Sequence, residues 1–218
     1  MPVIKIGKTP TTPQETQCKK PTGFFGRFTL WRMNKSHSKL TDWGLAHTTV
    51  ELGFTALDVG CGGGRTINKL AAIAAQGKVH GIDYSEESVA ASRRYNAQAI
   101  RFGRVAIYLA DVGKLPFQDN TFDLVTGVET HFWWSDIAAG LREIRRVLKP
   151  GGALILIAEV YKDADTTMSR LCEKYAPITG MKMLSIDEHR DLLAAVGFAD
   201  VRIDVLAAKG WITVQGRK

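Results

Sequence analysis

The sequence predicts a single-domain α/β protein with a mostly parallel sheet and helices on both of its faces. From residue 54 onward, short apolar runs typical of strands alternate with segments whose apolar residues recur at helical spacing. Glycine-rich or acidic segments follow the first three of these runs, and such strand ends border the ligand cleft of a parallel sheet. At 218 residues, the chain is long enough for one domain with its own core.

The expected strands are short apolar runs bounded by glycine, proline or acidic residues. They cover 54–59, 78–83, 105–109, 122–128 and 153–158, followed by an alternating pair at 201–206 and 211–214. Helices are expected at 66–75, from a Ser85 cap onward, at 136–148, and from a Ser185–Glu188 capping box to Gly197. Lys149–Gly152 is expected to be a turn, because Pro and Gly favour turn positions.

The chain divides into three parts. Residues 1–22 are expected to be a flexible basic lead-in, 23–52 a helical cap segment, and 53–218 the main domain. Residues 1–40 contain eight Lys or Arg and a single acid, Glu15, which accounts for the whole net charge of +7. Such a segment suits a nucleic acid, an anionic membrane or an acidic substrate, or it is a solvated tail.

Composition excludes several other classes of protein. Three separated cysteines with no CxxC pair indicate neither a disulfide framework nor a zinc site, and no acid–histidine cluster indicates another metal site. No apolar run approaches the roughly 20 residues of a membrane span, and the N-terminus lacks the apolar core of a signal peptide. A cytoplasmic protein is therefore expected, and its oligomeric state is not readable from these features.

The glycine cluster after the first strand is the strongest functional signal. It follows the pattern Asp58-x-Gly60-x-Gly62-x-Gly64, in which glycine permits a sharp turn and a close approach of the backbone to a ligand. A dinucleotide fingerprint would place a third glycine at position 65, which is Arg65 here. That difference argues against binding of a pyrophosphate.

Two acidic positions extend this signal to the next strands. Asp83 closes the second strand, 23 residues after Gly60, and its carboxylate can accept hydrogen bonds from both hydroxyls of a ribose. Asp111 follows the third strand and can accept a hydrogen bond from an adenine amino group. An N-cap role remains the plainer alternative for Asp83.

These motifs together resemble the class I S-adenosylmethionine (SAM) dependent methyltransferases, over roughly residues 38–216. Typical segments of the small-molecule branch follow at Leu115-Pro-Phe117, Phe122-Asp-Leu-Val125 and Arg146-Val-Leu-Lys-Pro-Gly-Gly152. The resemblance implies a Rossmann-like sheet of seven strands whose last strand is antiparallel, with SAM as cofactor and S-adenosylhomocysteine as product. It implies the cofactor-binding set Asp58, Gly60, Cys61, Gly62, Asp83, Tyr84, Asp111, Val112, Val128 and Glu129.

If the acceptor carries a proton, a general base has to remove it. The resemblance implies that residues after the fourth strand face the acceptor, so we look for the base there. His131, after the fourth strand, is the preferred candidate, and a structural loop histidine is its alternative. His37 and His47 in the leading segments and Glu159 after the fifth strand are further candidates. Phe132, Trp133 and Trp134 form either an acceptor-pocket wall or a packing anchor.

The expected function is methyl transfer from SAM to a small molecule. RNA or protein methylation guided by residues 1–40 is the first alternative. A nicotinamide-dependent oxidoreductase and a SAM-binding module without catalysis are the others. Arg65 argues against the oxidoreductase.

Overall fold

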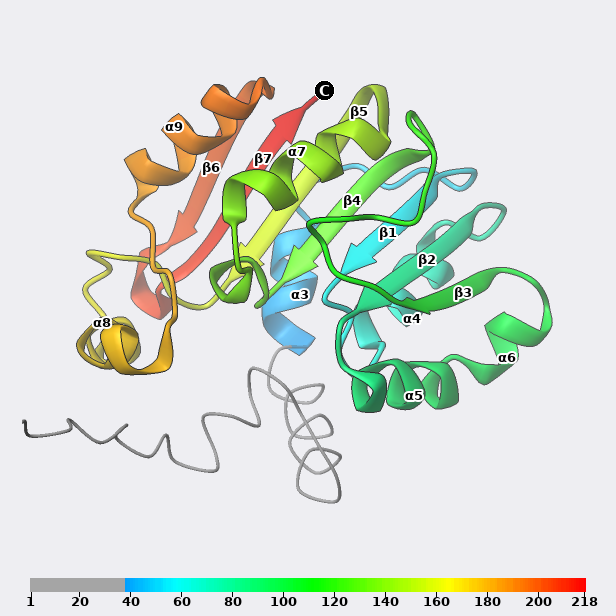
Figure 1. Ribbon diagram of the computed structural model, residues 1–218, viewed down its shortest axis with the longest axis horizontal. Helices are drawn as coiled ribbons and strands as arrows, with labels where there is room; N and C mark the ends of the chain where they lie inside the picture. The colour runs from blue at the N-terminus through cyan, green and yellow to red at the C-terminus, as the bar shows by residue number, and fades with distance from the viewer. Residues whose placement is uncertain (1–37) are drawn as a thin grey trace, which may run out of the picture.

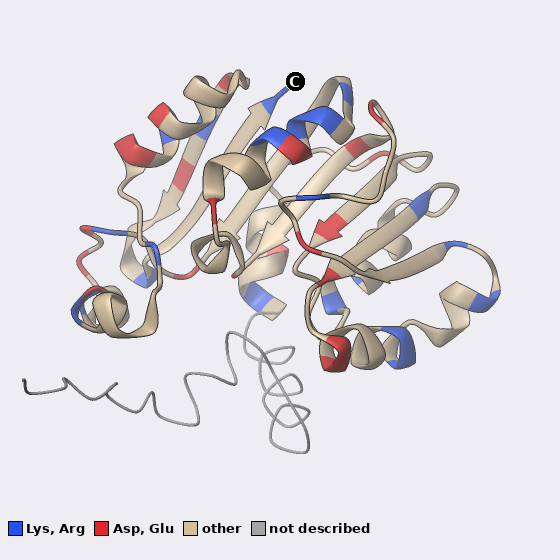
Figure 2. Cartoon of the chain, in the orientation of Figure 1, with Lys and Arg blue, Asp and Glu red and all other residues tan. Residues whose placement is uncertain are grey.

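The computed structural model describes residues 38–218, and the segment 1–37 lies outside the described residues. The predicted lead-in, the first half of the predicted cap and His37 therefore fall outside this description. Within residues 38–218, none of the helices combines the length and the apolarity that crossing a bilayer requires. Lys, Arg, Asp and Glu are scattered over the described elements (Figure 2).

Between residues 38 and 218, seven strands form one sheet in the order β3-β2-β1-β4-β5-β7-β6. Neighbouring strands from β3 to β5 are parallel, whereas β7 runs antiparallel to both β5 and β6. This arrangement confirms the Rossmann-like sheet with its antiparallel terminal strand (Figure 1). The strands are β1 Thr55–Val59, β2 Lys78–Asp83, β3 Val105–Leu109, β4 Phe122–Val128, β5 Leu148–Ala158, β6 Ala199–Leu206 and β7 Trp211–Arg217.

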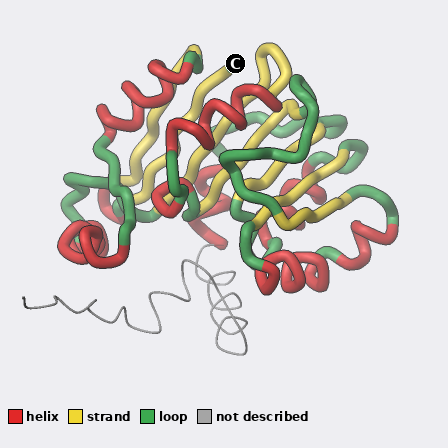
Figure 3. The backbone as a smooth tube through the Cα atoms, in the orientation of Figure 1, coloured by secondary structure: helices red, strands yellow, loops and turns green. Residues whose placement is uncertain are grey.

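Helices cover both faces of the sheet, as Figures 1 and 3 show. One face carries α7 Ile137–Val147 and α9 Ile186–Val196, and the opposite face carries α3 Ser38–Leu45, α4 Arg65–Ile73 and α5 Glu86–Tyr95. The remaining helical elements are α6 Ala97–Arg101, α8 Thr167–Thr179, η1 His131–Trp133 and η2 Ala207–Lys209.

Alternation along the central strands fills two separate cores. In β5, Leu154 and Leu156 pack toward α7, whereas Ile155 and Ile157 pack toward α3 and α4. The helix predicted at 136–148 corresponds to α7, and its apolar residues Leu141 and Ile144 are buried. Both faces of the parallel sheet are therefore covered, as their apolar strand sequences require.

The helix ends follow the capping signals of the sequence. The Ser85 hydroxyl accepts from the Ser88 N–H at the start of α5. Ser185 and Glu188 form both hydrogen bonds of a capping box at α9, and Gly197 ends that helix with φ 94°.

The segment Lys149–Gly152 differs from its predicted turn, because it belongs to β5. Leu148 already pairs with Phe122 of β4, and the sheet register shifts just beyond that pair. The Gly151 N–H donates to the Lys218 carbonyl and the Lys218 N–H to the Gly152 carbonyl, both at 3.0 Å. Pairing with the C-terminal residue thus extends a strand that the local sequence predicts to begin at Ala153.

The described part of the predicted cap segment, 38–52, contains one helix, α3, which ends at Leu45. Leu40 and Leu45 are buried in the core between the sheet and α4, and the backbone at Gly44 lies against Ile157 of β5. The described part of the predicted cap segment is thus packed on the sheet itself.

Candidate functional site

The backbone turn between β1 and α4 forms the floor of the candidate site. The N–H groups of Gly60 and Cys61 both donate to the Ile82 carbonyl of β2 at 2.9 Å. Gly60 has φ 71°, and a Cβ there would lie 2.2 Å from Thr130 Oγ1. Only glycine fits this position, because both its backbone conformation and its contact with Thr130 exclude a side chain.

Asp83 ties the end of β2 to this turn. One carboxylate oxygen accepts from the Gly62 N–H and the other from the Ser85 N–H, each at 2.9 Å. Burial raises the pKa of Asp83, while the hydrogen bonds from Ser85 and Gly62 oppose that rise. The N-cap of α5 is Ser85, so the capping alternative for Asp83 is not the observed arrangement.

The end of β3 brings Asp111 to the same edge. The Ala110 N–H donates to the Asp83 carbonyl at 3.0 Å, which fixes this segment beside β2. The Asp111 carboxylate accepts from the Gly113 N–H at 2.7 Å and stays exposed to solvent. Val112 is buried against the core beneath it.

The opposite wall follows β4. The Glu129 N–H donates to the Ile157 carbonyl at 2.9 Å, and the Glu129 carboxylate accepts from the Glu159 N–H. The Trp134 indole N–H donates to the Thr130 hydroxyl at 3.2 Å. These contacts fix the segment after β4, including the short helix η1.

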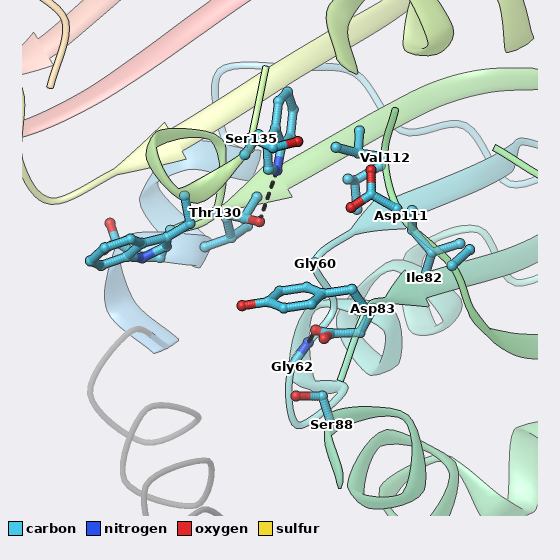
Figure 4. A pocket seen from close by; sticks show the side chains of 16 residues that line it. Gly60, Gly62, Ile82, Asp83, Ser88, Asp111, Val112, Thr130 and Ser135 are labelled. Carbon is cyan, nitrogen blue, oxygen red and sulfur yellow. Dashed lines mark hydrogen bonds between the residues drawn. The ribbon is translucent and has the colours of Figure 1, made fainter. Parts of the chain in front are cut away.

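These strand ends enclose a pocket with a volume of about 250 Å³, close to the lower end of the range for small-molecule sites. Figure 4 shows Gly62, Asp83 and Ser88 on one side and Thr130 and Ser135 opposite them. The residues of the predicted set that line the pocket are Gly60, Gly62, Asp83, Tyr84, Asp111, Val112, Val128 and Glu129.

Asp58 and Cys61, the other two residues of that set, do not line the pocket. The Asp58 carboxylate is buried on the α4 side of the sheet and accepts from the Thr126 hydroxyl at 2.6 Å. Burial raises the pKa of Asp58 to about 7, against the opposing effect of the Thr126 hydrogen bond. The Cys61 side chain is buried against Ser92, and burial raises the pKa of this thiol well above its usual value.

His131 lies outside the pocket wall, which corrects its predicted orientation. It is 2% exposed, and its Nε2 lies 3.0 Å from Nε2 of His189 in α9. The Ser185 carbonyl, 2.7 Å from His189 Nδ1, can only accept, so we assign that nitrogen as a donor and His189 Nε2 as the acceptor from His131. Burial first, and then His189, lowers the pKa of His131 well below its usual value.

Two further predicted bases, His47 and Glu159, do not line the pocket either. His47 Nδ1 lies 2.8 Å from the Trp43 carbonyl, and its ring packs edge-on against Trp43. Glu159 contributes its backbone N–H to Glu129, and its side chain is not among the lining groups. His37 belongs to the segment outside the described residues.

Several residues that line the two walls of the pocket were not predicted as lining residues from the sequence. Trp133 and Trp134 do line the pocket, whereas Phe132 is a core residue, so the aromatic triplet serves both of its proposed purposes. Some of them could have been predicted, because Val59, Ile82 and Ala110 are sequence neighbours of predicted residues at the same strand ends. The lining residues outside the predicted set are Val59, Ile82, Ser88, Ala110, Thr130, Trp133, Trp134 and Ser135.

Comparison with known proteins gives this pocket a context. Residues 57–156 match the family described as methyltransferase domain. The chain is 34% identical over 142 residues to the O-methyltransferase cnsE of Penicillium expansum, covering 65% of this chain and 51% of that protein. It is 35% identical over 137 residues to the demethylmenaquinone methyltransferase of Bacillus cereus (strain B4264), covering 61% and 52%.

A solved structure shares the fold. A SAM-dependent methyltransferase from Aquifex aeolicus superposes with a TM-score of 0.72 at 22% identity, covering 87% of this chain and 97% of that one. At this identity the likeness shows the fold alone. The chain spans about half the length of the curated relatives named above.

Proposed function

We propose that the chain carries a class I SAM-dependent methyltransferase domain, which binds SAM in the pocket beside Gly60 and methylates a small molecule. S-adenosylhomocysteine leaves as the product. One observation carries this proposal: the ends of four neighbouring strands place a glycine turn and three carboxylates, Asp83, Asp111 and Glu129, around one pocket.

The position of Asp83 at the pocket suits a ribose. Its carboxylate accepts from the Gly62 and Ser85 N–H groups, and hydrogen bonds from the Ser88 side chain and the Tyr84 backbone also lower its pKa. Asp83 nevertheless lines the pocket, and a carboxylate there can accept hydrogen bonds from ligand hydroxyls. We assign the ribose hydroxyls to Asp83 and the adenine to the space between Tyr84 and the Asp111–Val112 segment.

The glycine turn suits the methionine part of the cofactor. We assign that part to the backbone of Gly60 and Gly62, and the sulfonium to the neighbourhood of Val128 and Glu129. The Glu129 carboxylate brings negative charge to that wall, which favours a cation there. We assign Cys61 and Asp58 a structural role, because their buried side chains contact Ser92 and Thr126 and do not line the pocket.

Bound SAM supplies an activated methyl group, whose carbon–sulfur bond breaks as a bond to the acceptor atom forms. The chain has to hold that acceptor in line and exclude water, which Trp133 and Trp134 can do from the wall after β4. The phenol of Tyr84 is neutral at physiological pH, and burial raises its pKa further, to about 12. It can therefore donate a hydrogen bond but does not act as a base.

A small-molecule acceptor is favoured by the names of the two relatives. The first relative is named an O-methyltransferase, and the second methylates demethylmenaquinone by name. We also propose a cytoplasmic location, which rests on the sequence composition alone.

The decisive test is transfer of labelled methyl from SAM into fractionated cell extract, with the labelled species identified by mass. Calorimetric titration with SAM, S-adenosylhomocysteine and NAD provides the matching binding measurement. We expect SAM and its product to bind and NAD to give no heat. Binding of NAD in place of SAM overturns the proposal, whereas tight SAM binding without transfer to any fraction supports the non-catalytic module.

RNA or protein methylation is a second candidate, favoured by the eight basic residues among the first 40. Removing residues 1–22 separates the two functions. Turnover of a small molecule should survive this deletion, whereas an RNA complex should lose affinity and most of its salt dependence.

A further inference from the structure

Helix α8 presents its large apolar side chains to solvent. Met168, Leu171, Tyr175 and Ile178 follow one another at spacings of three and four residues, which places them on one face of the helix. These four side chains are 40–55% exposed among the described residues. The Lys174 ammonium lies 5.7 Å from the centre of the Tyr175 ring.

The face that α8 turns toward the domain is made of small residues instead. Ser169 is fully buried and Cys172 packs against the main core, and neither side chain provides a large apolar surface. In α7, by contrast, Leu141 and Ile144 face the sheet. An amphipathic helix with its large apolar face outward lacks a partner for that face in the described part of the chain.

We propose that residues 23–33 of the same chain pack on the α8 stripe formed by Met168, Leu171, Tyr175 and Ile178. This segment contains Phe24, Phe25, Phe28, Leu30, Trp31 and Met33, and it therefore offers the apolar side chains that the stripe requires. The inference concerns the packing of this chain and does not depend on the identity of the cofactor or the acceptor.

The proposed contact is consistent with where its two partners join the described fold. Residues 23–33 precede α3, which packs on β5, and α8 follows β5 in the sequence. Helix α8 follows the carboxyl end of β5, and α3 packs on the same strand through Gly44 and Ile157. Figure 1 shows α8 and the start of α3 at the edge toward which the arrowheads of the parallel strands point. Residues 34–37 add a tether of about 14 Å when extended, and α8 itself is about 20 Å long.

The size of the stripe favours a tethered segment over a second molecule. A stable interface between two proteins takes about 20–30 residues on each side, and four side chains on one helix fall far short of that number. A segment joined by a short linker has an effective concentration of about a millimolar, so a small apolar contact suffices.

Hydrogen–deuterium exchange of the full chain tests this contact from both sides. We compare the wild type with Phe28→Asp, Leu171→Asp and the double variant, with Leu171→Ala as a milder change. Phe102→Asp is the matched control, since Phe102 is an exposed aromatic residue, 70% exposed, in the α6–β3 connection.

The expected result is reciprocal. Amides of 23–33 should exchange at least tenfold more slowly in the wild type than in a free peptide of that sequence. Leu171→Asp should abolish that protection, Phe28→Asp should raise exchange in α8, and the double variant should add nothing further. Phe102→Asp should change neither region.

Three outcomes would overturn the proposal. One is peptide-like exchange of 23–33 in the wild type, and another is additivity of the two substitutions. The third is protection of α8 that appears only with rising protein concentration or with added anionic phospholipid vesicles, which would assign the stripe to a second copy or to a membrane. Circular dichroism of each variant identifies any that fails to fold, and Leu171→Ala then replaces the charged change.

Discussion

The carboxylate of Asp83 accepts a hydrogen bond from the Gly62 N–H at 2.9 Å, which joins the end of β2 to the turn after β1. The same carboxylate accepts from Ser85 with its second oxygen. Asp83 is therefore both a brace for the glycine turn and a surface of the pocket. Substitutions at this residue have to be designed so that the two roles can be separated.

Asp83→Asn should weaken SAM binding by about tenfold or more while the chain remains folded. The amide keeps one acceptor oxygen for a backbone N–H, but it loses the charge and the second acceptor oxygen of the carboxylate. Calorimetric titration with SAM measures the change. Asp111→Asn, an exposed carboxylate in the same pocket, is the comparison and should cost less. Unchanged SAM affinity in Asp83→Asn removes this residue from the ribose site.

Gly60→Ala should destabilise the fold by about 2 kcal/mol or more and abolish SAM binding. The alanine would have to keep a left-handed backbone conformation, and its methyl group would lie 2.2 Å from Thr130 Oγ1. Either Thr130 must move or the turn must open. Thermal unfolding and calorimetric titration measure the two effects. Gly103→Ala is the control, because Gly103 has φ 69° with nothing within 4 Å of an added Cβ. Equal losses in the two variants would show that the Thr130 contact is unimportant.

The sequence predicted the parts of the site that the backbone carries. Gly60, Asp83 and Asp111 follow strands whose apolar runs are easy to recognise, and parallel strands bring their carboxyl ends to one edge. The orientation of side chains beyond those ends was harder to predict. His131 turns toward α9, where its ring contacts His189. Because this partner is 58 residues away in the sequence, local sequence patterns do not reveal the contact.

The missed features of the fold have similar causes. Lys149–Gly152 has the composition of a turn, but the distant Lys218 extends it into β5. Helix α8 contains Pro177, and its inner face carries no large apolar side chains, so no core-forming helix was predicted there. The inward orientation of Asp58, by contrast, follows from strand alternation with the neighbouring Leu57 and Val59.

Asp58→Asn should stabilise the unliganded protein at neutral and higher pH. The pKa of Asp58 is raised from 3.8 to about 7 in the folded chain, chiefly by burial. The folded state therefore holds the proton more tightly than the unfolded state, and stability is lost as the pH rises from about 4 to about 7. The full loss amounts to at most about 4 kcal/mol.

Urea unfolding of both proteins between pH 4 and pH 8 measures this linkage. The amide keeps an oxygen that can accept from Thr126, so the difference reports the ionisation and not a lost hydrogen bond. The two stability curves should meet near pH 4 and separate above it. Parallel curves would mean that Asp58 titrates normally in the folded state.

The buried pair of His131 and His189 should make the protein sensitive to acid. Burial lowers the pKa of both imidazoles, so the folded state favours their neutral forms. Their contribution to stability is complete above the unfolded pKa of about 6.5 and is lost as the pH falls below it. Each neutral imidazole adds a slope of up to about 1.4 kcal/mol per pH unit in that range.

The double variant His131→Phe/His189→Leu should flatten this slope between pH 7 and pH 5. His131→Phe alone should cost about 1–3 kcal/mol at pH 7, because it leaves His189 Nε2 buried without its partner, whereas the double variant removes both polar groups. Urea unfolding measures these differences, and His47→Gln, outside the pair, should keep the wild-type slope. If the double variant loses stability on acidification as steeply as the wild type, the acid sensitivity arises elsewhere in the protein. Methyl transfer at pH 7.5 should persist in the double variant, because neither histidine reaches the pocket.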